Sequence, residues 1–172
     1  IVPWRRTPIT DWFIENGGHL DETGALFRRP LFFTRGKESG KQAAQREALA
    51  VRSRVGIYDS TPLGKIILTG PDVVTFLNRI YSNSWDKLPI GRGKYGFMLY
   101  DDGRLLDDGV TMRLSENQYL MSNSAGMAEV ALSHLEKLLH VTWPNLRVYL
   151  TPVTDQWAVV CVCGPQSREV IK

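Results

Sequence analysis

The feature that most constrains the fold is a strand–Gly–Pro–helix pattern that occurs twice in the sequence. The run Lys65–Gly70 precedes Pro71, and the run Ala158–Gly164 precedes Pro165. Proline suits the first turn of a helix, because the N–H that it lacks would have no helical partner there. After Pro71, apolar residues recur at helical spacing as far as Ile80. Each copy therefore predicts a strand that leads directly into a helix.

The chain between the two copies predicts a mostly antiparallel sheet with helices. Asp102-Gly103 separates two strand-like runs, which is a strong signal for a hairpin. The alternation of strands and helices favours an α+β fold with ferredoxin-like, split βαβ layers. The expected strands are 57–59, 63–69, 94–100, 104–114, 118–123, 146–153 and 157–163, and the expected helices are 38–55, 71–80 and 127–140.

The sequence predicts a boundary between an N-terminal arm and a domain at residue 36. Residues 1–36 are rich in aromatic residues, glycine and proline, and they lack sustained periodicity, which predicts an N-terminal arm or linker that packs on the domain. Residues 37–172 are expected to form the domain itself, beginning with a helix on which Ala44 and Ala48 recur at apolar spacing. The first residues include neither a starting methionine nor the apolar core of a signal peptide. We therefore interpret the chain as part of a longer protein whose domain is truncated.

The net charge of +3 is modest, but its distribution along the chain is uneven. Between Arg28 and Arg54 there are eight basic residues against two glutamates, so this segment carries +6. The segment is either a solvated helix face and loop or a site for an anionic ligand or a partner subunit. Nucleic acid is not expected, because the basic run lacks interleaved aromatic residues and no nucleic-acid motif occurs. No apolar run approaches the roughly 20 residues that a membrane helix needs, so no membrane partner is expected.

Most catalytic templates are absent from the sequence. There is no dinucleotide-binding glycine motif, no P-loop and no H-E-x-x-H or G-x-S-x-G motif. The three histidines are too dispersed to predict a metal site. The two cysteines and the lack of an N-x-[ST] site give no sign of secretion, so a cytoplasmic location is expected.

The aspartate pair Asp107-Asp108 is the strongest candidate for chemistry. Strand alternation predicts that Leu106, Asp108 and Val110 share one face, while Asp107 lies on the other. If the face of Asp108 is buried, its carboxylate must find a partner or have a raised pKa, which suits a proton-handling site. The alternative is a strand-end or bulge aspartate that bonds to the backbone. Asp107 is expected to be structural.

Two further residues are candidate ligand contacts. Tyr95 lies on the strand that pairs with that of Asp108, and its ring could stack on a flat heterocycle. The alternative is core packing, which is the commoner reason for an aromatic residue on a strand. Asn123 ends a strand and is a candidate polar contact, or else a helix cap or turn residue.

The sequence resembles the glycine-cleavage T-protein (aminomethyltransferase) family. The similarity extends over most of the chain in the expected order. It is carried by Arg46-Glu47-Ala48, Val55-Gly56-Ile57-Tyr58-Asp59, Gly70-Pro71-Asp72, Tyr95-Gly96, Asp102-Gly103, Asp107-Asp108-Gly109-Val110 and Gly164-Pro165.

Within this family, the chain is most similar to the alpha-subunit group of heterotetrameric sarcosine oxidases. The marks of that group include Tyr81–Leu88 and Trp143–Tyr149. Thr61–Gly64 stands where T-proteins usually carry Ser-His-Met-Gly, which favours the oxidase group over glycine cleavage.

The resemblance implies tetrahydrofolate as cofactor and a role in one-carbon metabolism. It implies that Asp108 hydrogen-bonds to or deprotonates a pterin-side nitrogen that takes a methylene group from oxidised sarcosine. The products would be 5,10-methylenetetrahydrofolate and glycine. The resemblance also implies folate contacts at Tyr95, Val110 and Asn123.

FAD, FMN and NAD would lie elsewhere in the complex, with the beta, gamma and delta subunits and the rest of the alpha chain as partners. The fragment alone is not expected to be active. The alternatives are another aminomethyltransferase, a dimethylglycine-oxidising relative or a non-catalytic folate-binding module.

Overall fold

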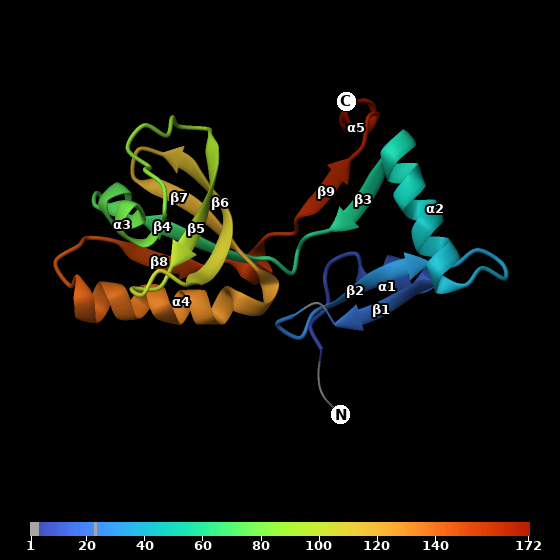
Figure 1. The fold of residues 1–172 in the computed structure, drawn as a ribbon, viewed down its shortest axis with the longest axis horizontal. Helices are drawn as coiled ribbons and strands as arrows, with labels where there is room; N and C mark the ends of the chain where they lie inside the picture. Colours follow the sequence, from blue (N-terminus) through green and yellow to red (C-terminus); the bar gives the residue numbers. More distant parts are fainter. Residues whose placement is uncertain (1–3, 23) are drawn as a thin grey trace. The chain divides into compact units, whose positions relative to one another are not determined.

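The computed structural model describes residues 4–22 and 24–172, which form two compact units. One unit contains the chain up to Pro62 together with residues 158–172, and the other contains Leu63–Trp157 (Figure 1). This division differs from the predicted boundary at residue 36, because residues 4–36 lie in the same unit as residues 37–62. Positions 1–3 and 23 of the predicted arm lie outside the described residues. The α+β fold class is confirmed.

The unit Leu63–Trp157 is built on one five-stranded antiparallel sheet of order β5-β6-β7-β4-β8. Strand β4 lies between β7 and β8 and is antiparallel to both, so β7 and β8 run parallel to each other. Their connection passes through α4, which makes a split βαβ unit of the kind that the sequence predicted. The elements are β4 (Gly64–Thr69), α3 (Val73–Ile80), β5 (Gly93–Leu99), β6 (Leu105–Ser115), β7 (Gln118–Asn123), η1 (Ala125–Met127), α4 (Ala128–Lys137), η2 (Leu138–Thr142), β8 (Tyr149–Pro152) and η3 (Thr154–Gln156).

Helices α3 and α4 cover one face of this sheet. The apolar side chains of α3 lie at the predicted spacing and are buried together with Ile66 and Leu68 of β4. Ala131 and Leu135 of α4 are fully buried, as predicted, and Leu135 joins the same core. Burying a leucine or phenylalanine side chain stabilises the fold by about 1.5–3 kcal/mol, so this core holds the sheet rigid. We call the side of the sheet that carries this core the helix-covered face.

The opposite side of the sheet, which we call the open face, exposes apolar side chains along β5 and β6. Tyr95 is 52% exposed, Phe97 46% and Val110 38%, and Met112 is exposed beside them. Strand alternation left open whether the face of Asp108 is buried, and in the structure this face is not buried within this chain. Such an apolar surface is unusual on an isolated soluble domain and marks a binding or contact surface.

A β-bulge interrupts the alternation in β6. Met98 pairs with Asp107 and Leu99 pairs with Leu105, so Leu106 is the extra residue on the bulged strand. Leu106 and Asp107 are consequently both buried. The prediction that Leu106 shares a face with Asp108 was wrong, because simple alternation does not anticipate the extra residue.

The other unit contains a helix, a hairpin and a second, two-stranded sheet. Its first part is α1 (Thr10–Glu15) followed by the hairpin of β1 (Gly18–Glu22) and β2 (Arg28–Phe33), which the sequence did not predict. The remaining elements are α2 (Gly40–Ser53), β3 (Gly56–Asp59), β9 (Val160–Cys163) and α5 (Ser167–Ile171), with β3 and β9 paired antiparallel.

Helix α2 begins at the predicted place but buries a different residue. Ser39 caps it, and a capping box with Gln42 fixes its first turn. Ala43 is fully buried, whereas Ala44 and Ala48, which the spacing placed on the apolar face, are exposed.

Part of the basic segment 28–54 has structural partners within its own unit. Arg46 forms an ion pair with Glu38 and also donates to the carbonyl of Phe33. The hydrogen bond from Arg46 lowers the pKa of Glu38 below its usual value. Arg28 stacks over the ring of Trp4, 5.4 Å from its centroid. These contacts support the structural interpretation for some of these cations, and the anionic-ligand interpretation stays a prediction for the others.

We predict that Gly70→Ala destabilises the chain. Gly70 has a φ of +136°, and a Cβ there would lie 2.0 Å from the carbonyl oxygen of Arg147. The strained backbone and the clash should lower the free energy of unfolding by about 2–4 kcal/mol, measured by urea denaturation. Gly126→Ala is the matched control, because a Cβ at Gly126 meets nothing within 4 Å. Equal denaturation midpoints for the two variants would contradict this account.

We also predict an alkaline loss of stability that depends on Tyr81. Tyr81 is buried, and burial, together with the charges of Asp107 and Asp108, raises its pKa to about 12. The unfolded chain would ionise Tyr81 near pH 10, so its contribution is complete below that pH and is lost as the pH rises toward 12. The loss should reach about 1 kcal/mol by pH 11 and should be absent in Tyr81→Phe. Parallel stability curves for the two proteins between pH 9 and about pH 11 would refute this assignment.

Candidate functional site

Three of the four predicted site residues lie together on the open face. Tyr95 is directly opposite Val110 in the β5–β6 ladder, and Phe97 is directly opposite Asp108. The hydroxyl of Tyr95 donates a hydrogen bond diagonally across the ladder to Oδ2 of Asp108. We call Tyr95, Phe97, Asp108, Val110 and Met112 the open-face cluster.

The electrostatics of the cluster are set by the Tyr95–Asp108 pair. The hydrogen bond to the Asp108 carboxylate raises the pKa of Tyr95, and partial burial and the charge of Asp107 act in the same direction. Tyr95 is therefore a neutral hydrogen-bond donor at physiological pH. No other hydrogen bond of Asp108 is found among the described residues, so its Oδ1 is available to a ligand.

Asp107 lies on the helix-covered face and is only 4% exposed. Its Oδ2 accepts a hydrogen bond of 3.0 Å from the backbone N–H of Ser124, just after the end of β7. Because a buried carboxylate needs such a partner, Asp107 connects β6 to the end of β7. This geometry supports the structural role that the sequence favoured for Asp107, and it leaves only Asp108 in the open-face cluster.

Ser122 is a residue of this site that the sequence did not reveal. Its hydroxyl accepts a hydrogen bond from the N–H of Val110 and donates one to the carbonyl of Val110, both at 2.9 Å. Gly109 lies against the backbone of Ser122, since a Cβ on Gly109 would be 2.0 Å from the carbonyl oxygen of Ser122. No local sequence signal indicates a side chain that bonds a backbone twelve residues away.

Asn123 is not part of the open-face cluster. By alternation along β7 it shares the helix-covered face with Tyr119 and Met121, which belong to the core. Its side chain is 2% exposed, and neither its amide oxygen nor its amide nitrogen has a hydrogen-bond partner among the described residues. A cap or turn role would require such a bond, so the geometry does not support that alternative.

The open-face cluster combines two kinds of chemistry. The rings of Tyr95 and Phe97 meet edge to face, with centroids 5.5 Å apart and an angle of 84° between their planes. Together with Val110 and Met112, these rings offer an apolar surface on which a flat ligand can pack. Asp108 adds one carboxylate oxygen that can accept a hydrogen bond or a proton from that ligand.

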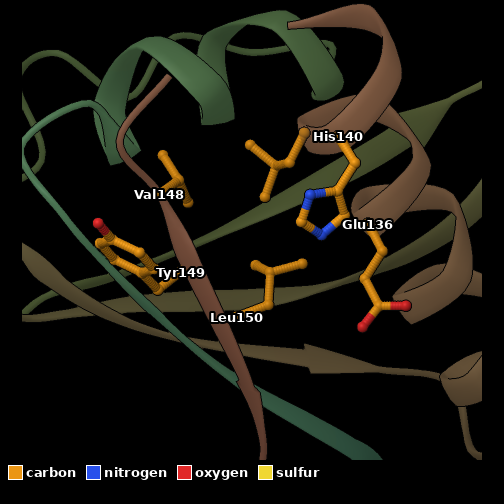
Figure 2. A pocket seen from close by; sticks show the side chains of 6 residues that line it. Glu136, His140, Val148, Tyr149 and Leu150 are labelled. Atoms are coloured by element: carbon orange, nitrogen blue, oxygen red, sulfur yellow. The ribbon is translucent and has the colours of Figure 1, made fainter. Parts of the chain in front are cut away.

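A pocket of about 190 Å³ lies elsewhere in the same unit, between β8 and the end of α4 with η2 (Figure 2). Leu139, Val148 and Leu150 give it apolar walls, and Glu136 and His140 lie at its helical side. Ligand pockets usually measure about 300–1,000 Å³, so this one suits only a small group. None of its lining residues belongs to the open-face cluster.

In the part of the chain that the structure describes, no group of three or more histidine, cysteine or acidic residues could hold a metal ion. Cys161 and Cys163 are free thiols of intermediate exposure. Within the same residues, no helix has both the length and the apolar character needed to cross a membrane.

Comparison with known proteins finds sarcosine oxidase alpha subunits and aminomethyltransferases as relatives. The chain is 41% identical over 170 residues to the sarcosine oxidase subunit alpha of Rhizobium meliloti, covering 99% of this chain and 17% of the relative. It is 43% identical over 169 residues to the subunit of that name from Corynebacterium sp. (strain U-96), covering 98% of this chain and 17% of the relative. An aminomethyltransferase of Exiguobacterium sibiricum is 32% identical over 168 residues, with 98% of this chain and 42% of that protein covered. The chain thus spans about a sixth of the length of the oxidase subunits.

A solved structure supports the same fold. The glycine cleavage system aminomethyltransferase T from Bartonella henselae superposes with a TM-score of 0.84 at 22% identity, over 98% of this chain and 43% of that one. The sequence profile of the GCVT N-terminal domain matches residues 9–172. Since this match covers nearly the whole chain, the protein belongs to the GCVT N-terminal domain family.

Proposed function

We propose that this chain is the folate-binding part of a sarcosine oxidase alpha subunit and that it transfers a methylene group from oxidised sarcosine to tetrahydrofolate. The observation that carries the proposal is the Tyr95–Asp108 hydrogen bond on an exposed apolar sheet face. The identity of 41–43% to sarcosine oxidase alpha subunits supports the choice of reaction.

The residues of the open-face cluster fit a reduced folate. Tyr95, Phe97 and Val110 would pack against its flat ring system, as aromatic and β-branched side chains do in ligand sites. Asp108 would accept a hydrogen bond from a ring-side nitrogen through Oδ1. The predicted Asn123 contact is not part of this proposal, because its side chain is buried on the opposite, helix-covered face of the sheet.

The proposed role of Asp108 is to remove a proton. Tetrahydrofolate would supply the nitrogen that accepts the methylene carbon. Asp108 Oδ1 would take the proton that this nitrogen loses as its bond to the methylene carbon forms, and would return it to the amine nitrogen as that nitrogen's bond to the carbon breaks. The second folate nitrogen would bond the same carbon and lose its own proton to the amine, so both C–N bonds of 5,10-methylenetetrahydrofolate would be made and glycine would leave as its ammonium form. Tyr95 holds Oδ2 during this step, so the carboxylate presents a single oxygen in a fixed direction.

The oxidation that precedes this transfer belongs to other parts of the complex. Sarcosine would lose a hydride, which is two electrons and one proton, to a flavin held elsewhere in the complex, and this loss would leave the iminium that carries the methylene group. FAD, FMN and NAD, the beta, gamma and delta subunits, and the rest of the alpha chain would supply that chemistry. The chain spans 17% of the oxidase relatives, so this assignment is part of the proposal.

A second candidate is an aminomethyltransferase that acts without a flavin in the same complex. The 32% identity to the Exiguobacterium protein and the shared fold favour it. Thr61–Gly64 departs from the Ser-His-Met-Gly of T-proteins, so we prefer the oxidase. An assay of methylene transfer decides between the two functions. The oxidase would form 5,10-methylenetetrahydrofolate from sarcosine, whereas an aminomethyltransferase would form it from an aminomethyl carrier protein.

We predict that Asp108→Asn in the full-length oxidase assembly uncouples oxidation from transfer. The amide cannot take a proton, so formation of 5,10-methylenetetrahydrofolate should fall about 100-fold or more, while sarcosine oxidation continues. The lost carbon should appear as formaldehyde. Both products are measured in one assay with oxygen consumption as the reference.

The matched control for this variant is Asp101→Asn, which removes a carboxylate from the exposed turn of the β5–β6 hairpin. It should transfer methylene at the wild-type rate. Wild-type transfer by Asp108→Asn would remove the role that we assign to Asp108. Tight folate binding without any transfer by the unmutated assembly would favour a non-catalytic folate-binding module.

A second prediction tests the geometry of the pair without folate. Because the hydrogen bond to Asp108 is the main reason for the raised pKa of Tyr95, that pKa should fall toward its usual value in Asp108→Asn. Ultraviolet difference titration at alkaline pH measures this change, and Tyr95→Phe identifies the signal of Tyr95. An identical titration curve in the wild-type and Asp108→Asn chains would show that the two side chains do not interact.

A further inference from the structure

The connection between β6 and β7 changes character next to Asp108. Main-chain pairing of the two strands begins at Thr111, which lies opposite Met121, and continues to Ser115. On the Asp108 side of that pair, side chains supply the connections between the strands. The position of Asp108 relative to β7 therefore depends on individual side chains.

Two side-chain bridges bracket Asp108 along β6. On one side, Asp107 accepts a hydrogen bond of 3.0 Å from the N–H of Ser124. On the other side, the hydroxyl of Ser122 accepts from the N–H of Val110 and donates to its carbonyl, at 2.9 Å in both cases. One hydroxyl thus does what a pair of main-chain bonds does in a regular antiparallel ladder.

The packing around Gly109 leaves little room for β6 to move toward β7. A Cβ at Gly109 would lie 2.0 Å from the carbonyl oxygen of Ser122 and 3.2 Å from its Oγ. The two strands are therefore in direct contact at this point, and the Ser122 hydroxyl determines how they lie against each other. If that hydroxyl is removed, the N–H and C=O of Val110 lose both partners and the strand can shift.

From this arrangement we infer that Ser122 is a positioning residue, whose hydroxyl fixes Val110 and Asp108 on the open face for the bound folate. The inference rests on the proposed function and extends it to a residue on a different strand. Ser122 acts through the backbone of Val110, so it need not touch the folate. Small displacements of a reacting group cost large factors in rate, which is why a single hydroxyl can matter here.

The test compares Ser122→Ala and Ser122→Thr in the full-length oxidase assembly. Three quantities are measured: binding of 5-formyltetrahydrofolate by calorimetry, kcat and KM for methylene transfer, and the alkaline titration of Tyr95. Thr151→Ala is the matched control, because Thr151 carries an exposed hydroxyl on the same sheet, in the edge strand β8. The melting temperature of each variant distinguishes a displaced Asp108 from a destabilised fold.

We expect Ser122→Ala to bind 5-formyltetrahydrofolate about tenfold more weakly and to transfer methylene about tenfold more slowly. Sarcosine oxidation and the melting temperature should stay close to those of Thr151→Ala. The alkaline titration of Tyr95 should shift toward its ordinary value, because Asp108 moves away from it. Ser122→Thr should restore all three quantities, since threonine keeps the hydroxyl and suits a strand.

Each other outcome has a distinct meaning. Binding, transfer and Tyr95 titration unchanged in Ser122→Ala would overturn the inference, as would a threonine variant that behaves like alanine. Lower melting temperature with unchanged Tyr95 titration would show that Ser122 is merely stabilising, which also overturns it. If the unmutated assembly neither binds the folate nor forms methylene product, the proposed function fails, and the Tyr95 titration still decides whether Ser122 positions Asp108.

Discussion

The β-bulge at Leu106 determines on which face of the sheet Asp107 and Asp108 lie. The extra residue makes Leu106 and Asp107 consecutive buried positions, so the strand returns to regular pairing with Asp108 on the open face. Without the extra residue, every side chain of β6 on one side of position 106 would point to the opposite face of the sheet. The separation of a buried, structural carboxylate from one that is accessible to a ligand follows from this single irregularity. Bulges that redirect a side chain are common beside functional sites.

The rest of the unit makes that arrangement rigid. Helices α3 and α4 bury the apolar side of β4 and β7, and Asp107 attaches the start of β6 to the residue that follows β7. Ser122 completes the attachment through Val110. The open face carries the exposed aromatic rings and the carboxylate, so stability and chemistry are divided between the two sides of one sheet. Functional groups on a packed strand are positioned more precisely than groups on a loop.

Local sequence signals predicted the elements that depend on turn residues and on helical periodicity. Asp102-Gly103 gave the hairpin and the apolar spacing after Pro71 gave α3, because turn residues and helical periodicity act over short distances. Alternation also placed Asp108 and Val110 on one face, whereas the position of Tyr95 on that face depends on the β5–β6 register. It could not say whether that face is buried, because both sides of β5 and β6 carry apolar residues. Ser122, the bulge and the buried side of α2 depend on contacts distant in sequence, which a local pattern does not contain.

The claim that the open face of the sheet binds folate through Asp108 is tested most directly by a crystal structure. The full-length oxidase assembly would be crystallised with 5-formyltetrahydrofolate, a stable reduced folate. We predict ring density packed on Tyr95, Phe97 and Val110, with a ring-side nitrogen within hydrogen-bonding distance of Asp108 Oδ1. Folate bound in the pocket beside Glu136 and His140, or bound without any contact to Asp108, would contradict it.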